Sequence, residues 1–196
     1  MEIKRQLRDE AKAVRASIPA SLRKEKSAYI LQSLIELPAF QEANRVFCFV
    51  SFRDEVETRP ILDYLWANDK RVFIPYIHQK KNVMHASELC NIDELEVGYF
   101  GVMEQKEAFI QLTPVDEIDL VITPGLLFDL EGYRVGYGGG YFDGFFASFK
   151  TPVTKIGICF QEQIRSTLPR APYDIPVDWI VTDQLIYHPA DKKKEA

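Results

Sequence analysis

"IDLVITPGLLFD", residues 118–129, is an apolar stretch broken by Pro124-Gly125, and "RVGYGGGYFDGFF", residues 134–146, follows it closely. The first stretch predicts a buried strand, and the second holds five of the chain's ten glycines. The phenylalanines then recur at helical spacing, which predicts a helix to about Lys150 with its apolar face on a sheet: Phe142, Phe145, Phe146 and Phe149. A strand, a glycine-rich loop and a helix in this order predict an α/β fold.

Further strands and helices alternate around this unit. Strands are expected at residues 45–52, 71–76, 83–89, 155–160 and 178–183, the third of them paired antiparallel. Helices are expected at residues 2–18, from a cap at Ser21 to Glu36, and at 59–69, with 90–118 mostly loop. This alternation predicts a mostly parallel sheet flanked by helices, with ligands bound beyond the carboxyl ends of its strands.

Composition limits the class of protein. The 196 residues, 46% of them hydrophobic, fit one domain over residues 1–196, with a frayed tail from about residue 190. Scattered cysteines and a charged N-terminus without an apolar leader predict a cytoplasmic protein, and no apolar run approaches the ~18 residues of a membrane span. A net charge of −5 argues against nucleic acid as a partner, and three histidines without ligand spacing predict no zinc site.

The glycine stretch has chemistry of its own. Glycines let the backbone adopt positive φ and approach a ligand, and the following helix N-terminus suits a phosphate group. The pattern matches neither the P-loop nor the dinucleotide-binding motif. Asp143 has two interpretations: it is an acid favoured by the dipole in the first helical turn, or a carboxylate that holds a divalent ion beside phosphates.

Four segments resemble one family. "TPGLLFDLEGYRVGYGGGYFDGFF" is similar to the signature of 5-formyltetrahydrofolate cyclo-ligases, also called 5,10-methenyltetrahydrofolate synthetases, and "KRQLR", "SFRDEVET" and "YDIPVDWIVTD" resemble other segments of that family. The resemblance implies a fold related to the sugar-phosphate isomerase and CoA-transferase group. It also implies an ATP- and Mg²⁺-dependent ligase that closes 5-formyltetrahydrofolate to 5,10-methenyltetrahydrofolate through a phosphorylated imidate, with release of ADP and phosphate.

The resemblance also implies site residues. Those for ATP are Lys4, Arg8, Arg134, Val135, Gly136, Tyr137, Gly138, Gly139, Gly140, Tyr141 and Phe142. Those for the folate are Val50, Glu55, Phe100, Tyr137, Gly138, Gly139, Gly140 and Tyr141, with Tyr99 in place of Phe100 if the alignment shifts by one residue. Arg134, Tyr141 and Asp143 are implied as catalytic, and Asp143 and Asp178 as magnesium ligands.

For several of these charged residues, a purely structural role stays open as an alternative. From spacing alone, Lys4 and Arg8 fit a solvated basic stripe and Arg134 fits a surface salt bridge. Asp178 fits an acid in a turn, and Glu55 fits an acid near a helix N-terminus. For the whole chain, the alternatives are an enzyme with another substrate and a non-catalytic regulator that binds nucleotide or folate. We expect a monomer or weak dimer whose partners are ATP and 5-formyltetrahydrofolate.

Overall fold

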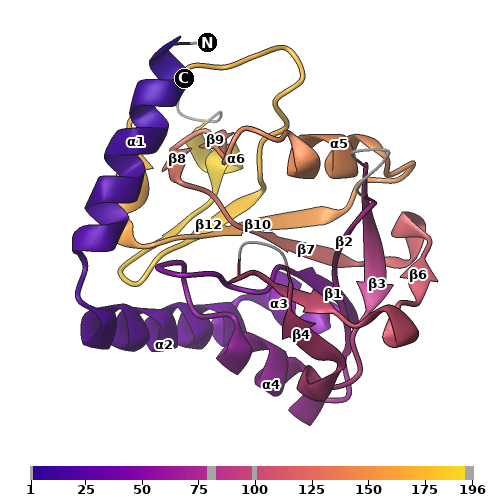
Figure 1. Ribbon diagram of the computed structural model, residues 1–196. Helices are drawn as coiled ribbons and strands as arrows, with labels where there is room; N and C mark the ends of the chain where they lie inside the picture. Colours follow the sequence, from indigo (N-terminus) through magenta and orange to yellow (C-terminus); the bar gives the residue numbers. More distant parts are fainter. Residues whose placement is uncertain (1, 79–82, 99–100, 193–196) are drawn as a thin grey trace.

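An eight-stranded sheet forms the centre of the protein in the computed structural model, which describes residues 2–78, 83–98 and 101–192 (Figure 1). Across the sheet, the strands are β13 (Ile186–Tyr187), β12 (Trp179–Val181), β10 (Thr154–Ile158), β7 (Leu120–Thr123), β1 (Arg45–Cys48), β2 (Arg71–His78), β3 (Val83–Glu88) and β6 (Leu112–Thr113). The strands from β12 to β2 are parallel, and β13, β3 and β6 are antiparallel at the edges. The predicted α/β class and the antiparallel third strand are confirmed.

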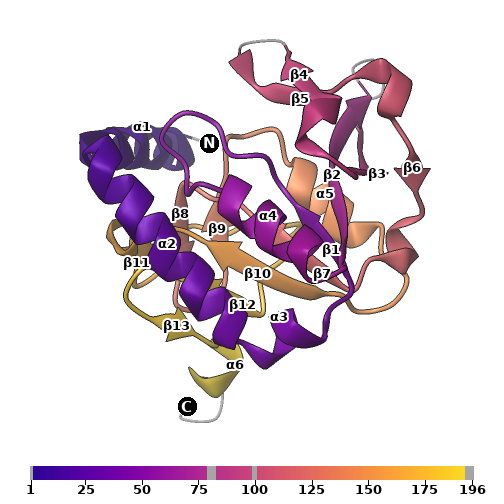
Figure 2. The same ribbon diagram turned by 90° about the horizontal axis from the view of Figure 1, so that it is seen from below.

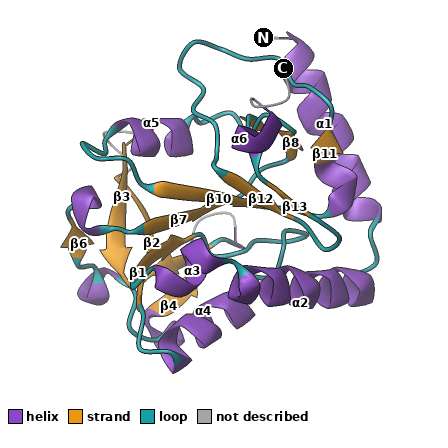
Figure 3. Ribbon diagram, turned by 180° about the vertical axis from the view of Figure 1, so that it is seen from behind, coloured by secondary structure: helices purple, strands orange, loops and turns teal. Residues whose placement is uncertain are grey.

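Helices cover both faces of this sheet. They are α1 (Glu2–Ser17), α2 (Ala20–Glu36), α3 (Pro38–Glu42), α4 (Arg59–Ala67), α5 (Tyr141–Ala147) and α6 (Pro189–Lys192). Helices α2, α3 and α4 lie against one face and α5 against the other, while α1 stands along one end of the molecule (Figures 1 and 3). In the described part of the chain, no helix is both long and apolar enough to cross a membrane.

Successive side chains of a strand point to opposite faces of the sheet, and apolar residues pack on both faces. In β1, Val46 and Cys48 join the cluster that includes α2 and α4, whereas Phe47 joins the cluster on the other face with Phe145 and Phe146 of α5. The rings of Phe47 and Phe145 lie 4.5 Å apart. The predicted phenylalanine stripe is therefore the face by which α5 packs on the sheet.

Some predicted boundaries are wrong. Helix α2 begins after Pro19, and Ser21 lies inside its first turn without capping it. The apolar stretch 118–129 is two strands of different sheets, because β8 (Leu127–Asp129) pairs with β9 (Arg134–Val135) and β11 (Ile164–Arg165). The expected loop at 90–118 contains β6 and a hairpin of β4 (Leu95–Val97) and β5 (Met103–Gln105).

The predicted end of α2 at Glu36 is confirmed, whereas the two C-terminal helices differ from the prediction. Helix α5 stops at Ala147, short of Lys150. Pro38 follows α2 and is also the first residue of α3. A proline is well tolerated at the first position of a helix. The expected frayed tail overlaps α6.

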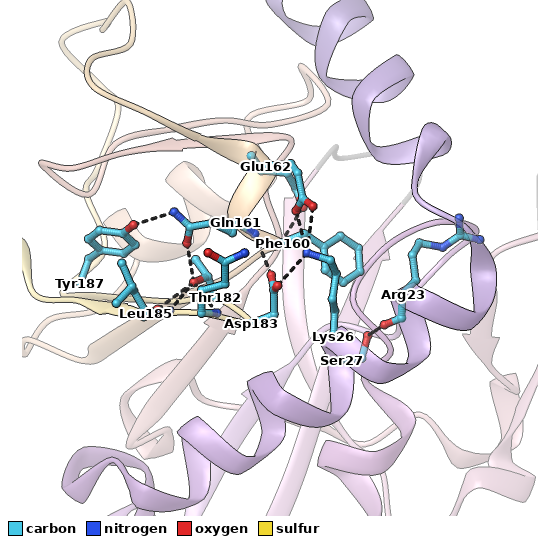
Figure 4. A network of polar contacts seen from close by, with 12 residues as sticks. Arg23, Lys26, Ser27, Phe160, Gln161, Glu162, Thr182, Asp183, Leu185 and Tyr187 are labelled. Carbon is cyan, nitrogen blue, oxygen red and sulfur yellow. Dashed lines mark hydrogen bonds and ion pairs between the residues drawn. The ribbon is translucent and has the colours of Figure 1, made fainter.

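The buried Lys26 links α2 to loops that follow two strands of the central sheet (Figure 4). Lys26 Nζ lies 2.7 Å from Asp183 Oδ2 and 2.8 Å from Glu162 Oε1. These acids belong to the segments that follow β12 and β10. One residue further along α2, Ser27 Oγ accepts the backbone N–H of Glu57 at 3.0 Å. Neighbouring residues of one helix thus hold loops from both halves of the chain.

Candidate active site

A cavity of about 1200 Å³ opens where the parallel strands end. Phe49 and Val50 directly follow β1, Pro124 directly follows β7, and all three line the cavity. The other walls come from α1, β2, the glycine loop at 136–140, the start of α5 and the β4–β5 hairpin. This is the edge of the sheet where an α/β fold binds ligands. The volume exceeds the usual ~300–1000 Å³ of a site for one small molecule, so two ligands can fit.

The glycine loop presses against α1. Gly138 has φ +109° and Gly140, the residue before α5, has φ +66°, and side chains rarely tolerate such values. Arg8 Nε donates to the carbonyl oxygen of Gly136 at 2.9 Å. A Cβ on Gly138 would lie 3.4 Å from Arg8 Cζ. The bare backbone therefore allows both the turn and the close approach of the arginine.

Three basic residues of α1 face the cavity, one helical turn apart. Lys4 Nζ lies 2.6 Å from Asp174 Oδ2, and Arg8 contacts the glycine loop. Lys12 also lines the cavity, and its ion pair with Asp9 is long, at 4.0 Å. The structure thus brings Lys4 and Arg8 to the cavity, and Arg8 to the glycine loop, so these two residues are not a stripe exposed to solvent alone.

Arg134 is buried beside Asp143. Its Nη2 donates to Asp143 Oδ1 at 2.9 Å, and its Nη1 donates to the carbonyl oxygen of Ile175 at 2.7 Å. The Ile175 N–H donates to the same Asp143 oxygen at 3.0 Å. Burial lowers the pKa of Arg134 despite the opposing effect of the Asp143 charge. With Arg134 only 8% exposed, the surface salt bridge considered from sequence does not describe this pair.

The structure does not bring Asp178 to the cavity, contrary to the predicted magnesium pair. Asp178 precedes β12, at the amino end of a parallel strand, and the cavity lies at the carboxyl ends. Its Oδ2 accepts the backbone N–H of Lys155 at 2.7 Å and pairs with Lys155 Nζ at 2.9 Å. Strand polarity, already implied by the sequence, was the signal that could have excluded this residue.

Asp174, four residues before Asp178, is on the cavity lining instead. It lines the cavity with Asp143, and its neighbour Ile175 is bonded to Asp143. Both bonds to Asp143 end on Oδ1, which leaves Oδ2 outside the hydrogen bonds among described residues. Mg²⁺ prefers one or two carboxylates completed by phosphate oxygens and water. No group of three or more metal-binding side chains occurs in the described ranges.

Glu55, itself only 8% exposed, lies in a hydrogen-bonded network with the half-exposed Tyr137 on another wall of the cavity. Its Oε1 accepts the Tyr137 hydroxyl at 2.5 Å and its Oε2 accepts the Phe52 N–H at 2.9 Å. The Tyr137 oxygen in turn accepts Arg15 Nη2 at 2.8 Å, and the same Arg15 nitrogen lies 2.8 Å from Asp54 Oδ1. Burial raises the pKa of Glu55, although both hydrogen bonds oppose that effect. The pKa of Tyr137 is also raised, by burial and by the Glu55 charge, so its hydroxyl stays a donor.

The other predicted site residues lie around the same cavity, with one exception. Those on its lining are Val50, Val135, Gly136, Gly138, Gly139, Gly140, Tyr141 and Phe142. Phe142 also packs edge-on against Phe47 at 6.2 Å. Phe100 and the alternative Tyr99 fall outside the described residues. The sequence argument missed Asp174, and it gave no role to Lys12 or Arg15, although both belong to the basic stripe of α1.

Comparisons with known proteins agree with this geometry. A family model described as the 5-formyltetrahydrofolate cyclo-ligase family matches residues 1–183. The chain is 29% identical to 5-formyltetrahydrofolate cyclo-ligase from Escherichia coli, over 79% of this chain and 86% of that one. It is 26% identical to the enzyme of the same name from Haemophilus influenzae, over 89% and 94% of the two chains.

Two solved structures share the fold. The NMR structure of 5,10-methenyltetrahydrofolate synthetase from Aquifex aeolicus superimposes with a TM-score of 0.83, at 29% identity, over 95% of this chain and 93% of that one. A 5,10-methenyltetrahydrofolate synthetase from Mycoplasma pneumoniae superimposes with a TM-score of 0.75, over 92% and 99% of the two chains. At 18% identity, this second likeness concerns the fold alone.

Proposed function

Since the chain belongs to the 5-formyltetrahydrofolate cyclo-ligase family, we propose that it uses ATP and Mg²⁺ to close 5-formyltetrahydrofolate to 5,10-methenyltetrahydrofolate, with release of ADP and phosphate. The observation that carries this proposal is the composition of one large cavity. Its lining includes the glycine loop, basic side chains, two carboxylates suited to a metal, and the buried acid Glu55. We take residues 1–196 as a single domain for this reaction.

The reaction needs two bond exchanges. The formyl oxygen attacks the γ-phosphorus of ATP, forming an O–P bond as the bond to the ADP oxygen breaks. N10 then forms a bond to the formyl carbon, the carbon–oxygen bond to phosphate breaks, and N10 loses its proton. Phosphoryl transfer of this kind depends on positioning and neutralisation of charge more than on a protein nucleophile.

Cations beside the glycine loop suit the phosphate end of the cavity. Arg8 lies at the loop and Lys4 lines the same cavity, and the bare backbone from Gly136 to Gly140 leaves room for phosphate oxygens. Asp143 and Asp174 would hold Mg²⁺, which when bound neutralises phosphate charge. Arg134 orients Asp143 through the 2.9 Å hydrogen bond. Lys4 gives Asp174 a cationic neighbour, so nucleotide binding is expected to rearrange that pair.

Glu55 and its neighbours suit the pterin. A buried carboxylate accepts hydrogen bonds from the donor edge of a pterin ring, and Tyr137 holds Glu55 in one orientation. Val50 and Tyr141 provide apolar walls for a flat ring. The glycine loop, which lies between Glu55 and the phosphate site, would let the formyl group and the γ-phosphate approach each other.

The test is product formation by the purified protein. On mixing with folinic acid, ATP and Mg²⁺, we expect absorbance to rise in the methenyl-folate band and ADP to appear in equal amount. Asp143→Asn and Arg134→Ala should abolish the rise, with thermal melting as the check that each variant is folded. If the folded wild-type protein binds ATP or folinic acid and releases no ADP, the alternative of a non-catalytic regulator replaces this proposal.

A further inference from the structure

Arg15 is a buried arginine of α1 to which the proposed reaction assigns no role. Its side chain is 5% exposed, and its Nη2 donates to Asp54 Oδ1 and to the Tyr137 hydroxyl oxygen, both at 2.8 Å. The loop after β1, which carries Asp54, passes beside α1 (Figure 2). One helix residue thereby joins this loop to the glycine loop, on the wall of the cavity where Glu55 lies.

Stability alone does not explain this arginine. Its Nε is buried and has no hydrogen-bond partner among the residues that the structure describes. A buried donor without a partner costs free energy, and the buried polar groups of folded proteins are nearly always satisfied. Replacing a buried ion pair by well-packed apolar side chains is often neutral or stabilising. The charge of Arg15 thus carries a cost, which is more typical of a functional site than of a packing contact.

Donor chemistry fixes the direction of the Tyr137 hydroxyl proton. An arginine side chain has only hydrogen-bond donors, so the Tyr137 oxygen accepts from Arg15. Its single proton is then directed to Glu55 Oε1, 2.5 Å away. Burial and the Glu55 charge raise the pKa of Tyr137, which keeps that proton on the hydroxyl. The three side chains form one chain of hydrogen bonds that ends on the carboxylate, and the bonds in such a chain strengthen one another.

The ring of Tyr137 depends on these bonds for its position. It is 51% exposed and belongs to none of the apolar clusters in the described part of the chain. Its neighbours Gly136 and Gly138 leave the backbone conformationally free. The guanidinium group of Arg15 lies 5.7 Å from the ring centroid, which adds an attraction to the hydrogen bond. Among the described residues, Glu55 is the other hydrogen-bond partner of this hydroxyl.

Arg15 and Asp54 act on Glu55 in opposite directions. Burial raises the pKa of Glu55, and the hydrogen bonds from Tyr137 and the Phe52 backbone lower it. The positive charge of Arg15 lowers this pKa further, and the negative charge of Asp54 raises it. Arg15 Nη1 lies 3.9 Å from Glu55 Oε1. Two side chains that are bonded to each other therefore have opposite effects on the same acid.

Other charged residues also contribute to the cavity wall. Lys12 of α1 and Arg53 of the loop after β1 line the cavity, and neither is within ion-pair distance of Glu55 in the described structure. Glu104 of β5 lines it as well, and it has the same charge as Glu55. Within the described residues, Arg15 is thus the cation that acts on Glu55 at short range.

We propose that Arg15 is a positioning residue for the folate, an inference that rests on the proposed function. Arg15 holds the Tyr137 hydroxyl in place, and Tyr137 in turn holds Glu55 as an oriented, ionised acceptor. Each oxygen of Glu55 already has one donor. A carboxylate accepts about four hydrogen bonds, so positions remain for the N–H groups of the pterin. Asp54 partly balances the charge of Arg15 and so limits its effect on Glu55.

The test uses two substitutions that break the same ion pair and have opposite effects on charge. Arg15→Met removes the cation, and Asp54→Asn removes the anion. We would measure KM for 5-formyltetrahydrofolate and for ATP between about pH 5 and 8, in wild type, in both variants and in Arg15→Lys.

Opposite shifts are the expected result. In Arg15→Met, the folate KM at neutral pH should rise about 10-fold, as for the loss of a hydrogen bond that supports a charged group. The increase of this KM at low pH should begin at a higher pH than in wild type, because Glu55 is protonated more easily. In Asp54→Asn the increase should begin at a lower pH than in wild type. KM for ATP should stay unchanged in both variants.

Two further variants separate charge from geometry. Lysine keeps the positive charge, but its single ammonium group does not hold both neighbours as the planar guanidinium does. In Arg15→Lys, the pH profile should therefore stay near that of wild type while the folate KM is intermediate. Arg5→Gln removes a charge of the same helix whose side chain is 75% exposed and lies outside the cavity lining, and it should change neither quantity.

A merely structural role of Arg15 predicts another pattern. Both substitutions would then lower the melting temperature, and their folate pH profiles would coincide with wild type or shift in the same direction. Either result overturns the inference. If Arg15→Met does not fold, Asp54→Asn and Arg15→Lys decide: an onset in Asp54→Asn at the wild-type pH or above it overturns the inference.

Failure of the proposed function gives a separate result, in which the wild type forms no methenyl product at any pH. Equilibrium binding of folinic acid without ATP, over the same pH range and in the same variants, then tests the inference by itself. Opposite shifts of the binding profile in Arg15→Met and Asp54→Asn support the inference, and equal shifts overturn it. A folded wild type that binds no folinic acid overturns both proposals.

Discussion

Glu55 has a buried carboxyl group whose charge depends on its neighbours. Burial raises its pKa, and the hydrogen bonds from Tyr137 and from the Phe52 backbone lower it in part. Tyr137→Phe keeps the ring and removes one of these donors, so the pKa of Glu55 should rise further. A protonated Glu55 accepts hydrogen bonds poorly. We therefore expect KM for the folate to increase as pH falls, and this increase to begin at a higher pH in Tyr137→Phe than in wild type.

Steady-state kinetics between about pH 5 and 8 would test this prediction. KM for ATP serves as the internal control, since Glu55 is assigned to the folate alone. Identical pH profiles of the folate KM in both proteins would show that the Tyr137 hydroxyl does not set the charge of Glu55.

The two aspartates of the segment at 174–178 should behave differently. Asp174→Asn removes a carboxylate from the cavity, so kcat/KM should fall about 100-fold or more, in line with the several kcal/mol that a bound metal contributes. The Mg²⁺ concentration for half-maximal rate should rise as well. Asp178→Asn removes an ion pair with a 43% exposed side chain, and it should cost about 1 kcal/mol or less of stability and leave kcat/KM unchanged. Equal loss of activity in both variants would contradict the assignment.

At the level of residues, most of the site residues predicted from sequence lie on the cavity lining, but their distant partners were missed. Lys4, Arg8 and Arg134 belong to recognisable segments, so their presence at the cavity could be predicted. Strand polarity argues against Asp178 at the cavity, but the presence of Asp174 there depends on the path of a loop, which neither spacing nor composition describes. The bond from Arg15 to Tyr137 joins residues 122 positions apart, and local patterns carry no information about such a pair.

The positive φ of Gly138, a residue of the glycine loop beside α1, disfavours a side chain there. Its φ of +109° strains any other residue, by about 1–3 kcal/mol. In Gly138→Ala the new methyl group would touch Arg8 at an ordinary contact distance of 3.4 Å, so the expected strain comes from the backbone. We expect a lower free energy of unfolding and a KM for ATP that rises about 10-fold.

Gly144→Ala is the matched control within α5. A Cβ at Gly144 meets nothing within 4 Å, and alanine favours a helix over glycine by about 0.5–1 kcal/mol. This variant should be slightly more stable, with kinetics like the wild type. Urea denaturation and ATP titration of the rate measure both variants. Equal effects of the two substitutions would refute the role assigned to the loop backbone.

Long elements were easier to predict than short ones. Apolar spacing located α1 and the packing face of α5 correctly. The β4–β5 hairpin and α3 are only three to five residues long per element, too short for a periodic pattern to emerge, and neighbouring parts of the fold stabilise them. The apolar stretch from 118 to 129 could be identified as buried, but its division between two sheets depends on pairing with β9 and β11.

Across the whole molecule, Lys26 connects α2 with the loops after β10 and β12. Burial alone would lower its pKa, but hydrogen bonds to Asp183 and Glu162 outweigh this effect and raise it. Lys26→Met leaves Asp183, whose side chain is 5% exposed, without its cation. Loss of one partner of a buried pair costs about 3 kcal/mol or more, and we expect that decrease in the free energy of unfolding.

Lys24→Met, at an exposed position of the same helix, should change the free energy of unfolding by less than about 0.5 kcal/mol. Chemical denaturation of both variants beside wild type measures the difference. A Lys26→Met protein as stable as the Lys24→Met protein would mean that the network of Figure 4 does not stabilise the fold.

The mostly parallel pairing of the sheet could be predicted from the sequence, but the order of its strands could not. Alternating strands and helices imply parallel pairing, and that prediction is confirmed. Strand β7 lies between β1 and β10, although β1 and β7 are far apart in the sequence. This order depends on which apolar surfaces pack against one another. Strand polarity predicts at which edge of the sheet the cavity lies. It does not predict that α1 contributes to the wall of the cavity.

The ion pair between Lys4 and Asp174 spans 170 residues, and this has a consequence for synthesis on the ribosome. At roughly 5–20 residues per second, α1 emerges about 10–35 s before the segment that completes its side of the cavity. During that interval, a nascent chain can form neither the aspartate pair nor the contact that holds Lys4. Ligand binding can therefore assist only the last stage of folding, and a truncated translation product that ends before Asp174 gains no protection from nucleotide.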